Sequence, residues 1–316
     1  MSGFLQDHTP EWIDYFTLSG YPGARPLSSG VEGAIYTLGD GVVAKVWGKR
    51  QEAELRHIQG FYQDVTRVQL PFTIPEILRI ENVGGVAVTY ERELHGEPLR
   101  KHLAFDGADV DLAGAEAVSE VLACLATVPV TARIKEVSVL DEQCSMWAGK
   151  SSFAEALIGL LERRMIRFAP VLAGRVEAFD RKYRCTVDGI VSLGEPQLSA
   201  LHGDLFGENI LADDTMKVTA VLDFGFLSTG GDPRLDAAIS AAIFDMYGPH
   251  ARRISGSLTR RFAEELHYPI DTLRLYQAAY ALATSNFFTP DGAEGDGHFE
   301  WCVALLNRDE IMGPLL

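Results

Sequence analysis

The chain has 316 residues, 47% of them hydrophobic, and a formal net charge of −16 at pH 7. This size allows a substantial core and two lobes, while the negative charge disfavours nucleic acid and anionic membranes as partners. The sequence has no run of eighteen apolar residues, so no membrane span is expected.

The beginning of the chain and its cysteines indicate a cytoplasmic location. The sequence MSGFLQDHTPEW lacks a basic stretch followed by an apolar one, so we expect no secretory signal. The four cysteines are widely spaced and form no zinc motif, which is typical of reduced thiols.

The first third of the chain predicts a β-rich lobe. A short helix over residues 11–18 and a loop over residues 20–33 precede a hairpin, whose strands flank the turn Gly39-Asp40-Gly41. Apolar residues at core spacing predict a helix over residues 49–62. Two further strands, residues 77–80 and 86–90, surround a turn at residues 82–85.

Two features of this lobe suit phosphate binding. The loop containing Ser29 and Gly30 precedes paired strands, so its backbone amides could cover phosphates, although a plain β-turn gives the same pattern. Lys45 shares its strand face with Val43 and Trp47, and a lysine among apolar neighbours needs an anion or a path to solvent. An exposed lysine on an edge strand is the alternative interpretation.

The remaining two thirds predict a helical lobe. Ser152 and Glu155 form a capping box that begins a long amphipathic helix. We expect Arg163, Arg164 and Arg167 on the solvated face of that helix. A strand is predicted over residues 195–201. Further helices are predicted over residues 236–246, 258–266, 270–288 and 300–306.

The most informative stretch is ALHGDLFGENILADDTMKVTAVLDFGFLSTGGDP, residues 200–233. Two short apolar runs, residues 210–212 and 218–222, predict a hairpin with Asp204 and Asn209 before it and Asp223 after it. A carboxylate that accepts a proton and two oxygen ligands for magnesium are what phosphoryl transfer requires. We expect Asp232 and Asp236, which follow, to cap or brace their turn rather than bind metal.

The pattern HGD-x-x-x-x-N followed by DFG resembles the aminoglycoside phosphotransferase family, antibiotic kinases with a protein-kinase-like fold. Choline, homoserine, fructosamine and macrolide kinases are built similarly. The resemblance implies an α+β, two-lobe fold, with a nucleotide-binding lobe over residues 1–93 and a catalytic, substrate-binding lobe over residues 94–316. It also implies ATP and Mg²⁺, with Asp204 as the catalytic residue and Asn209 and Asp223 as metal ligands.

The resemblance also assigns residues around the nucleotide. The strand lysine of the family contacts the α- and β-phosphates and pairs with a helix glutamate, here Glu52 or Glu54, with Glu52 preferred. Ser29 belongs to the phosphate loop. The segment EREL, residues 91–94, resembles the hinge, where a backbone carbonyl and a backbone amide hold adenine; we place them at Arg92 and Leu94.

The charge distribution bears on the acceptor. Residues 1–93 hold 8 Lys and Arg against 12 Asp and Glu, and the remainder holds 20 against 32, so the C-terminal part carries −12. This favours a cationic small molecule, although acidic surfaces also serve solubility. Asp291, Glu294 and Asp296 are candidates for a cation-attracting rim. A metabolite kinase of the choline, homoserine or sugar type, or a non-catalytic nucleotide-binding protein, remains the alternative.

Overall fold

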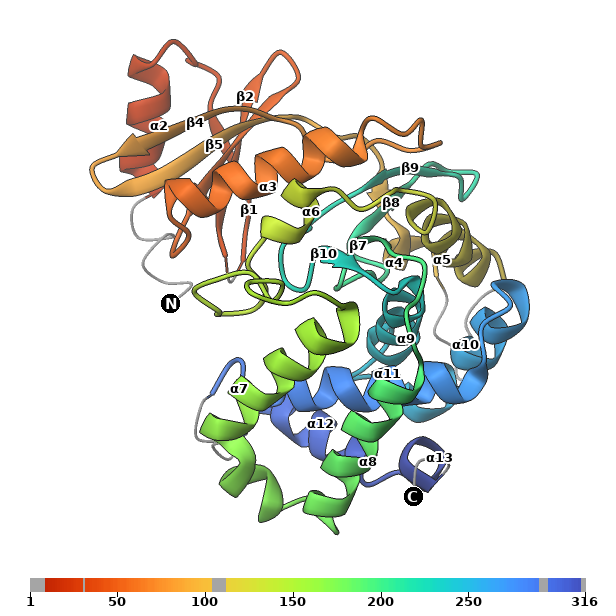
Figure 1. Cartoon of the computed structure of the whole chain (residues 1–316). Helices are drawn as coiled ribbons and strands as arrows, with labels where there is room; N and C mark the ends of the chain where they lie inside the picture. Colours follow the sequence, from red (N-terminus) through yellow and green to blue (C-terminus); the bar gives the residue numbers. More distant parts are fainter. Residues whose placement is uncertain (1–8, 31, 104–111, 290–294, 314–316) are drawn as a thin grey trace. The chain divides into compact units, whose positions relative to one another are not determined.

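The computed structural model describes residues 9–30, 32–103, 112–289 and 295–313 (Figure 1). The chain divides into two compact units, Met1–Gly96 with Thr219–Leu222, and Glu97–Val218 with Asp223–Leu316. The first is β-rich and the second mainly helical, which confirms the predicted α+β, two-lobe fold. The roles assigned to the predicted lobes, residues 1–93 and 94–316, stay predictions.

The first unit is built on an antiparallel sheet that has five strands within the described residues (Figure 1). The predicted hairpin is present, and Lys45 pairs with Ile35 on one side and Thr89 on the other. The strand order is β1-β2-β3-β5-β4. In that order the strands are Arg25–Ser29, Gly33–Gly39, Val42–Trp47, Val86–Arg92 and Ile77–Val83.

The predicted loop over residues 20–33 is partly wrong, because Arg25–Ser29 forms strand β1. All five residues of β1 are exposed, so the strand lacks the apolar alternation by which a half-buried strand is found. Pro26 also reads as a loop residue, but a proline is tolerated on an edge strand such as this one.

Among the described residues of the first unit, helices α2 and α3 accompany the sheet. Helix α2, Thr9–Leu18, inserts Phe16 beside Tyr36, with ring centroids 5.3 Å apart, in a cluster of buried apolar residues. Helix α3, Glu52–Val65, begins three residues later than predicted, because Gln51 and Glu54 form a capping box at its start.

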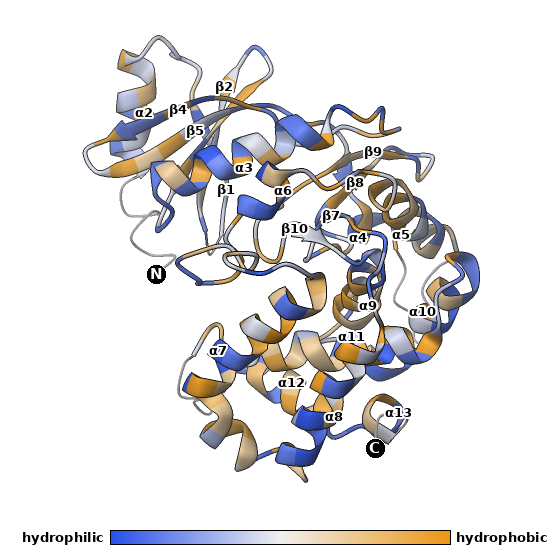
Figure 2. Ribbon diagram, in the orientation of Figure 1, coloured by the Kyte–Doolittle hydropathy of each residue, from blue (hydrophilic) through white to orange (hydrophobic). Residues whose placement is uncertain are grey.

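The second unit is organised around two buried helices, α9 (Pro233–Ile243) and α11 (Ile270–Thr284). Gln277 of α11 donates a hydrogen bond to the carbonyl of Ala238 in α9. Figure 2 shows α9 and α12 mainly in the colours of hydrophobic residues, whereas α8 carries more hydrophilic colour. The other helices of this unit are α4 (Leu99–His102), α5 (Leu112–Leu125), α6 (Ala132–Glu136), α7 (Phe153–Ala173), α8 (Phe179–Ser192), α10 (Ala251–Glu265), α12 (Gly297–Leu306) and α13 (Asp309–Met312).

One prediction for helix α7 is wrong. The capping box of Ser152 and Glu155 is present, but Arg164 is fully buried instead of solvated. Its guanidinium pairs with Asp141 and lies over the Phe168 ring, 4.9 Å from the centroid. The carboxylate that makes burial of this charge possible comes from a loop outside the helix, so helical periodicity could not reveal it.

Short strands frame the predicted site. Strand β7 (Ser199–Leu201) pairs with β10 (Thr229–Gly231), and another sheet has the order β6-β8-β9. In that sheet the strands are Glu97–Pro98, Ile210–Ala212 and Val218–Val221, so the predicted hairpin of β8 and β9 is confirmed. Within the described part of the chain, no helix combines the length and apolar character needed to cross a membrane.

Candidate active site

The segment His202-Gly203-Asp204 follows β7 and is held by hydrogen bonds from its own backbone. The amide of Asp204 donates to Nδ1 of the buried His202, at 3.2 Å. Gly203 has φ of 77°, and a Cβ on it would lie 2.3 Å from the carbonyl carbon of Leu227. Only glycine fits this left-handed position against a neighbouring backbone. The turn that leads into Asp204 therefore requires a glycine at position 203.

Asn209 is tied to the same turn. It is 5% exposed and lies directly before β8. Its Nδ2 donates to the carbonyl oxygen of Asp204, at 2.8 Å. This contact fixes the amide group, so that Oδ1 is directed away from the Asp204 backbone.

The Asp223-Phe224-Gly225 segment after β9 is joined to the His202 turn by two contacts. The amide of Gly225 donates to Oγ of Ser228, at 2.7 Å, and that hydroxyl donates to the carbonyl of His202, at 2.6 Å. The rings of Phe224 and His202 lie 4.4 Å apart. The two sequence motifs therefore form one packed assembly in the second unit.

Asp223 itself has an unusual backbone conformation. Its φ is 53°, in the left-handed region that residues other than glycine rarely adopt. Its side chain is exposed. A strained, exposed carboxylate beside a packed loop is a common feature of functional sites.

Asp236 on α9 braces the turn that contains His202 and Gly203. Its two carboxylate oxygens accept hydrogen bonds from the amides of His202 and Gly203, each at 2.7 Å. Burial raises the pKa of Asp236 to about 6, although these two hydrogen bonds lower it. Asp232 caps α9 by accepting from the Arg234 amide. Asp232 therefore caps its own turn as expected, whereas Asp236 braces the His202 turn instead of its own.

The raised pKa of Asp236 predicts a pH effect on stability. Because its folded pKa of about 6 exceeds its usual value of 3.8, the contribution of this group is lost as pH rises through about 6. Relative to Asp236→Asn, which does not titrate, the wild type should lose free energy of unfolding between about pH 4 and about pH 6.5. Urea unfolding of both proteins across this range measures the difference; a difference independent of pH would contradict the prediction.

Lys45 lies in a charged cluster of the first unit. Its Nζ is 3.3 Å from Oε2 of Glu32 and 4.0 Å from the centroid of the Trp47 ring. Arg50 binds the other oxygen of Glu32, at 2.7 Å. Burial raises the pKa of Glu32, but the charges of Lys45 and Arg50 outweigh this effect and hold the pKa below its usual range. A carboxylate beside the loop between β1 and β2 therefore contacts Lys45 in this structure.

The two predicted glutamate partners of Lys45 make other contacts. Glu52 forms an ion pair with Arg56 on the next turn of α3, and Glu54 accepts a hydrogen bond from the amide of Gln51. The choice between them stays a prediction, and Glu32 is a carboxylate that the structure places on Lys45.

The other predicted nucleotide-binding residues also lie in the first unit. Ser29 ends β1 opposite Ala34. Arg92 ends β5, and its amide donates to the carbonyl of Glu76, at 3.1 Å. Leu94 follows the strand, and no described residue accepts a hydrogen bond from its amide. A hinge role for Arg92 and Leu94 stays a prediction.

The proposed acidic rim is only partly within the described residues. Asp291 and Glu294 lie outside them. Asp296 is the N-cap of α12 and accepts hydrogen bonds from the amides of His298 and Phe299. Asp296 therefore has a structural role that the sequence analysis did not identify.

Sequence reasoning missed two residues of the site. Ser228 connects the two motifs, but a serine three residues beyond DFG carries no signal of that contact. Glu32 lies in the segment that was predicted as a phosphate loop, and its position between two cations depends on the pairing of β2 and β3.

Comparison with known proteins gives one family and a set of shared folds. The family model described as the phosphotransferase enzyme family (APH) matches residues 23–256. A search of curated proteins finds no significant match.

Solved structures resemble this chain over most of its length, at identities that establish the fold alone. Aminoglycoside phosphotransferase APH(3'')-Id from Streptomyces rimosus, in complex with ADP and streptomycin, is 19% identical with a TM-score of 0.55, covering 88% of this chain and 98% of its own. Macrolide 2'-phosphotransferase MphH from Brachybacterium faecium is 18% identical with a TM-score of 0.55, covering 95% of this chain and 98% of its own. The GDP and kanamycin complex of APH(2")-IIIa is 15% identical with a TM-score of 0.63, covering 94% of this chain and 97% of its own.

Proposed function

We propose that this chain, which belongs to the phosphotransferase enzyme family, transfers the terminal phosphoryl group of ATP to a hydroxyl group of a cationic antibiotic of the aminoglycoside kind. It is a phosphotransferase of the kinase type with an alcohol group as acceptor. The observation that carries the proposal is the hydrogen-bonded assembly that joins the His202-Gly203-Asp204 turn, Asn209 and the Asp223-Phe224-Gly225 segment.

Asp204 is the proposed catalytic residue. Its backbone is fixed on both sides, through its amide and through its carbonyl, while its side chain is half-buried. A carboxylate in a fixed position can orient the acceptor hydroxyl and take up its proton as the new phosphate ester forms. The other proposed groups bind and orient the nucleotide, because phosphoryl transfer depends mainly on positioning and charge.

Asn209 and Asp223 are the proposed magnesium ligands. An amide oxygen and a carboxylate are hard oxygen donors, which fit the preference of this ion. The contact of Asn209 Nδ2 with Asp204 directs the amide oxygen away from that backbone, and the Asp223 carboxylate is exposed. When bound, magnesium would neutralise phosphate charge.

Lys45 is the proposed phosphate-binding cation. It already holds the Glu32 carboxylate, an oxyanion with the same donor requirements as a phosphate oxygen. Ser29 is proposed to contribute to the phosphate loop, and the backbone of Arg92 and Leu94 to hold the base. Among the solved relatives, one holds ADP and another GDP, so the preferred nucleotide is open to test.

Removal of the Lys45 ammonium should weaken nucleotide binding. Lys45→Ala is expected to raise the KM for ATP by about tenfold or more, because one charge-assisted contact to phosphate is lost. Titration of ATP at saturating acceptor measures the change. Glu52→Gln and Glu54→Gln form a matched pair, of which Glu52→Gln should be the more harmful. Equal KM values for Lys45→Ala and wild type would remove Lys45 from the site.

The acceptor is proposed to be cationic. The chain carries −16, and the solved relatives include complexes with streptomycin and with kanamycin. Acidic groups, for which Asp291, Glu294 and Asp296 were the sequence candidates, would attract a polycation through interactions that salt screens. A metabolite kinase is the alternative within the same chemistry, and a non-catalytic nucleotide-binding protein is the alternative outside it.

A panel of acceptors tests this function. ATP consumption is measured with aminoglycosides, macrolides, choline, homoserine and neutral sugars, each at low and high salt. We expect an aminoglycoside to give the largest acceptor-dependent rate, with a KM that rises with salt concentration. A neutral best acceptor would contradict the cationic-acceptor proposal, and the absence of ATP consumption with every acceptor would favour the non-catalytic alternative.

A further inference from the structure

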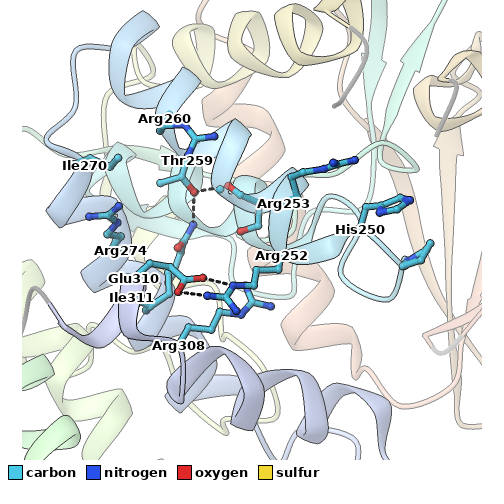
Figure 3. Close-up of a pocket in the computed structure, with 14 residues that line it drawn as sticks. His250, Arg252, Arg253, Thr259, Arg260, Ile270, Arg274, Arg308, Glu310 and Ile311 are labelled. Atoms are coloured by element: carbon cyan, nitrogen blue, oxygen red, sulfur yellow. Dashed lines mark hydrogen bonds and ion pairs between the residues drawn. The ribbon is translucent and has the colours of Figure 1, made fainter. Parts of the chain in front are cut away.

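A pocket of about 630 Å³ lies in the second unit beside helices α10, α11 and α13 (Figure 3). Its size is in the range of small-molecule sites. Residues of the catalytic assembly do not line it: the described lining begins at Pro249 and ends at Ile311. The pocket is therefore separate from the site proposed above.

The lining of this pocket is strongly basic. The pocket is lined by a single carboxylate, that of Glu310, and by five arginines: Arg252, Arg253, Arg260, Arg274 and Arg308. His250 adds a titratable ring at the start of α10. The whole chain has a net charge of −16, so a local cluster of positive side chains is not what its average composition predicts.

Only part of this positive charge is compensated. Glu310 binds Arg252 through two contacts, at 2.6 and 2.7 Å, as Figure 3 shows, and Arg274 pairs with Asp271. Arg253, Arg260 and Arg308 form no ion pair with any carboxylate of the described chain. Three guanidinium groups in one pocket thus have no direct ion pair among the described residues, although the charge of Glu310 also acts on Arg308.

Arg308 is the most constrained of the three. It is half-buried and precedes α13 as its N-cap residue. Burial lowers its pKa, Glu310 raises it and the neighbouring Arg252 lowers it, yet a guanidinium remains charged at neutral pH. A partly buried guanidinium that shares one carboxylate with Arg252 is incompletely neutralised, so an anion in the pocket would stabilise this arrangement.

A buried polar side chain of the pocket, Gln277, has an acceptor atom without a hydrogen-bond donor among the described residues. Gln277 lines the pocket and is fully buried. Its Nε2 donates to Thr259 and to the carbonyl of Ala238, whereas its Oε1 accepts no hydrogen bond from the described residues. A buried acceptor of this kind calls for a donor, such as a hydroxyl group or a protonated phosphate oxygen.

We infer that the pocket between α10, α11 and α13 is a binding site for a multivalent oxyanion that carries a hydroxyl group, of the class of small phosphorylated molecules. The forked donors of Arg253, Arg260 and Arg308 match the oxygens of a phosphate group. The acceptor oxygen of Gln277 takes the hydroxyl. This ligand need not be a substrate or product of the phosphoryl transfer.

The test uses inorganic pyrophosphate and a hexose bisphosphate as probes, with chloride at equal ionic strength and the neutral hexose as controls. Calorimetric titration of the full chain should show saturable binding of both anions and none of the neutral hexose. Arg308→Gln, and separately the exposed pair Arg253→Gln/Arg260→Gln, should weaken binding by about tenfold or more. Arg184→Gln and Arg181→Gln/Arg184→Gln, which alter exposed arginines on α8, are the charge-matched controls and should bind as the wild type does.

The nucleotide site could also take these probes, so each titration is repeated in Lys45→Ala. Binding that survives Lys45→Ala and is lost with the pocket variants supports the inference. Binding that is lost in Lys45→Ala and kept in the pocket variants would assign the anion to the nucleotide site and overturn it. The inference is also overturned if chloride binds as the two anions do, or if the charge-matched control variants weaken binding as much as the pocket variants do. It is overturned as well if neither anion binds at millimolar concentration.

Discussion

Asp204→Ala is expected to lower kcat by about 10²-fold or more. The reason is that its carboxylate is the only proposed proton acceptor for the substrate hydroxyl, and its backbone is fixed by His202 and Asn209. The change removes only the side chain, so nucleotide binding should be nearly unchanged. The measurement is initial rate against both substrates, together with calorimetric titration of the nucleotide.

Asp204→Asn is the matched variant, because it keeps the shape of the side chain and removes its basicity. Both variants should be folded and bind nucleotide with a Kd close to that of the wild type. Turnover near the wild-type rate in either folded variant would remove Asp204 from the proposed role. A loss of nucleotide binding in parallel with kcat would instead indicate that the loop had lost its structure.

The second large effect concerns the metal ligands. Asp223→Ala should reduce magnesium-dependent turnover to background, because the variant lacks the charged ligand of the cation. Asn209→Ala should do less damage, because it removes a neutral ligand and one contact to the Asp204 carbonyl. Activity measured against magnesium concentration distinguishes the two, since a weakened site is partly rescued by more metal.

Phe224→Leu provides a control for Asp223→Ala, because it alters the same segment without touching a proposed ligand. Its ring packs on His202, so some loss of rate is expected, with an unchanged dependence on magnesium. If Asp223→Ala and Asn209→Ala both keep the wild-type magnesium dependence, the assignment of this hairpin as a metal site is wrong.

The sequence predicted the parts of the fold whose local pattern repeats within one element. The hairpin of β2 and β3 has an apolar alternation and a glycine turn, and the capping box of α7 lies within four residues. Helix α8 was not predicted. Its N-cap residue is Ala178, whose backbone is left-handed and whose side chain makes no cap, so the usual start signal is absent.

Contacts between distant segments could not be predicted in the same way. Arg164 looked like a surface residue of α7 until the loop that carries Asp141 placed a carboxylate beside it. Glu32 contacts Lys45 because β2 and β3 pair in one register, and shifting that register by one residue would turn the lysine to the other face of the sheet. Such contacts depend on packing, which a single sequence does not specify locally.

The two motifs of the proposed active site are an intermediate case. The order and spacing of Asp204, Asn209 and Asp223 predicted that they would gather at one end of a hairpin. Ser228, which connects the two motifs, and Asp236, which braces the His202 turn, come from segments after the hairpin. Asp236 was expected to brace its own turn, and its contact with the His202 turn across 34 residues emerged only from the structure.

The most direct test of the central proposal is mass spectrometry of the acceptor after incubation with ATP, magnesium and enzyme. The proposed function predicts an acceptor heavier by one phosphoryl group, modified on a hydroxyl oxygen, and no such product with Asp204→Asn. An acceptor panel that stays unmodified while ATP binds normally, or a product that forms equally with Asp204→Asn, would contradict it.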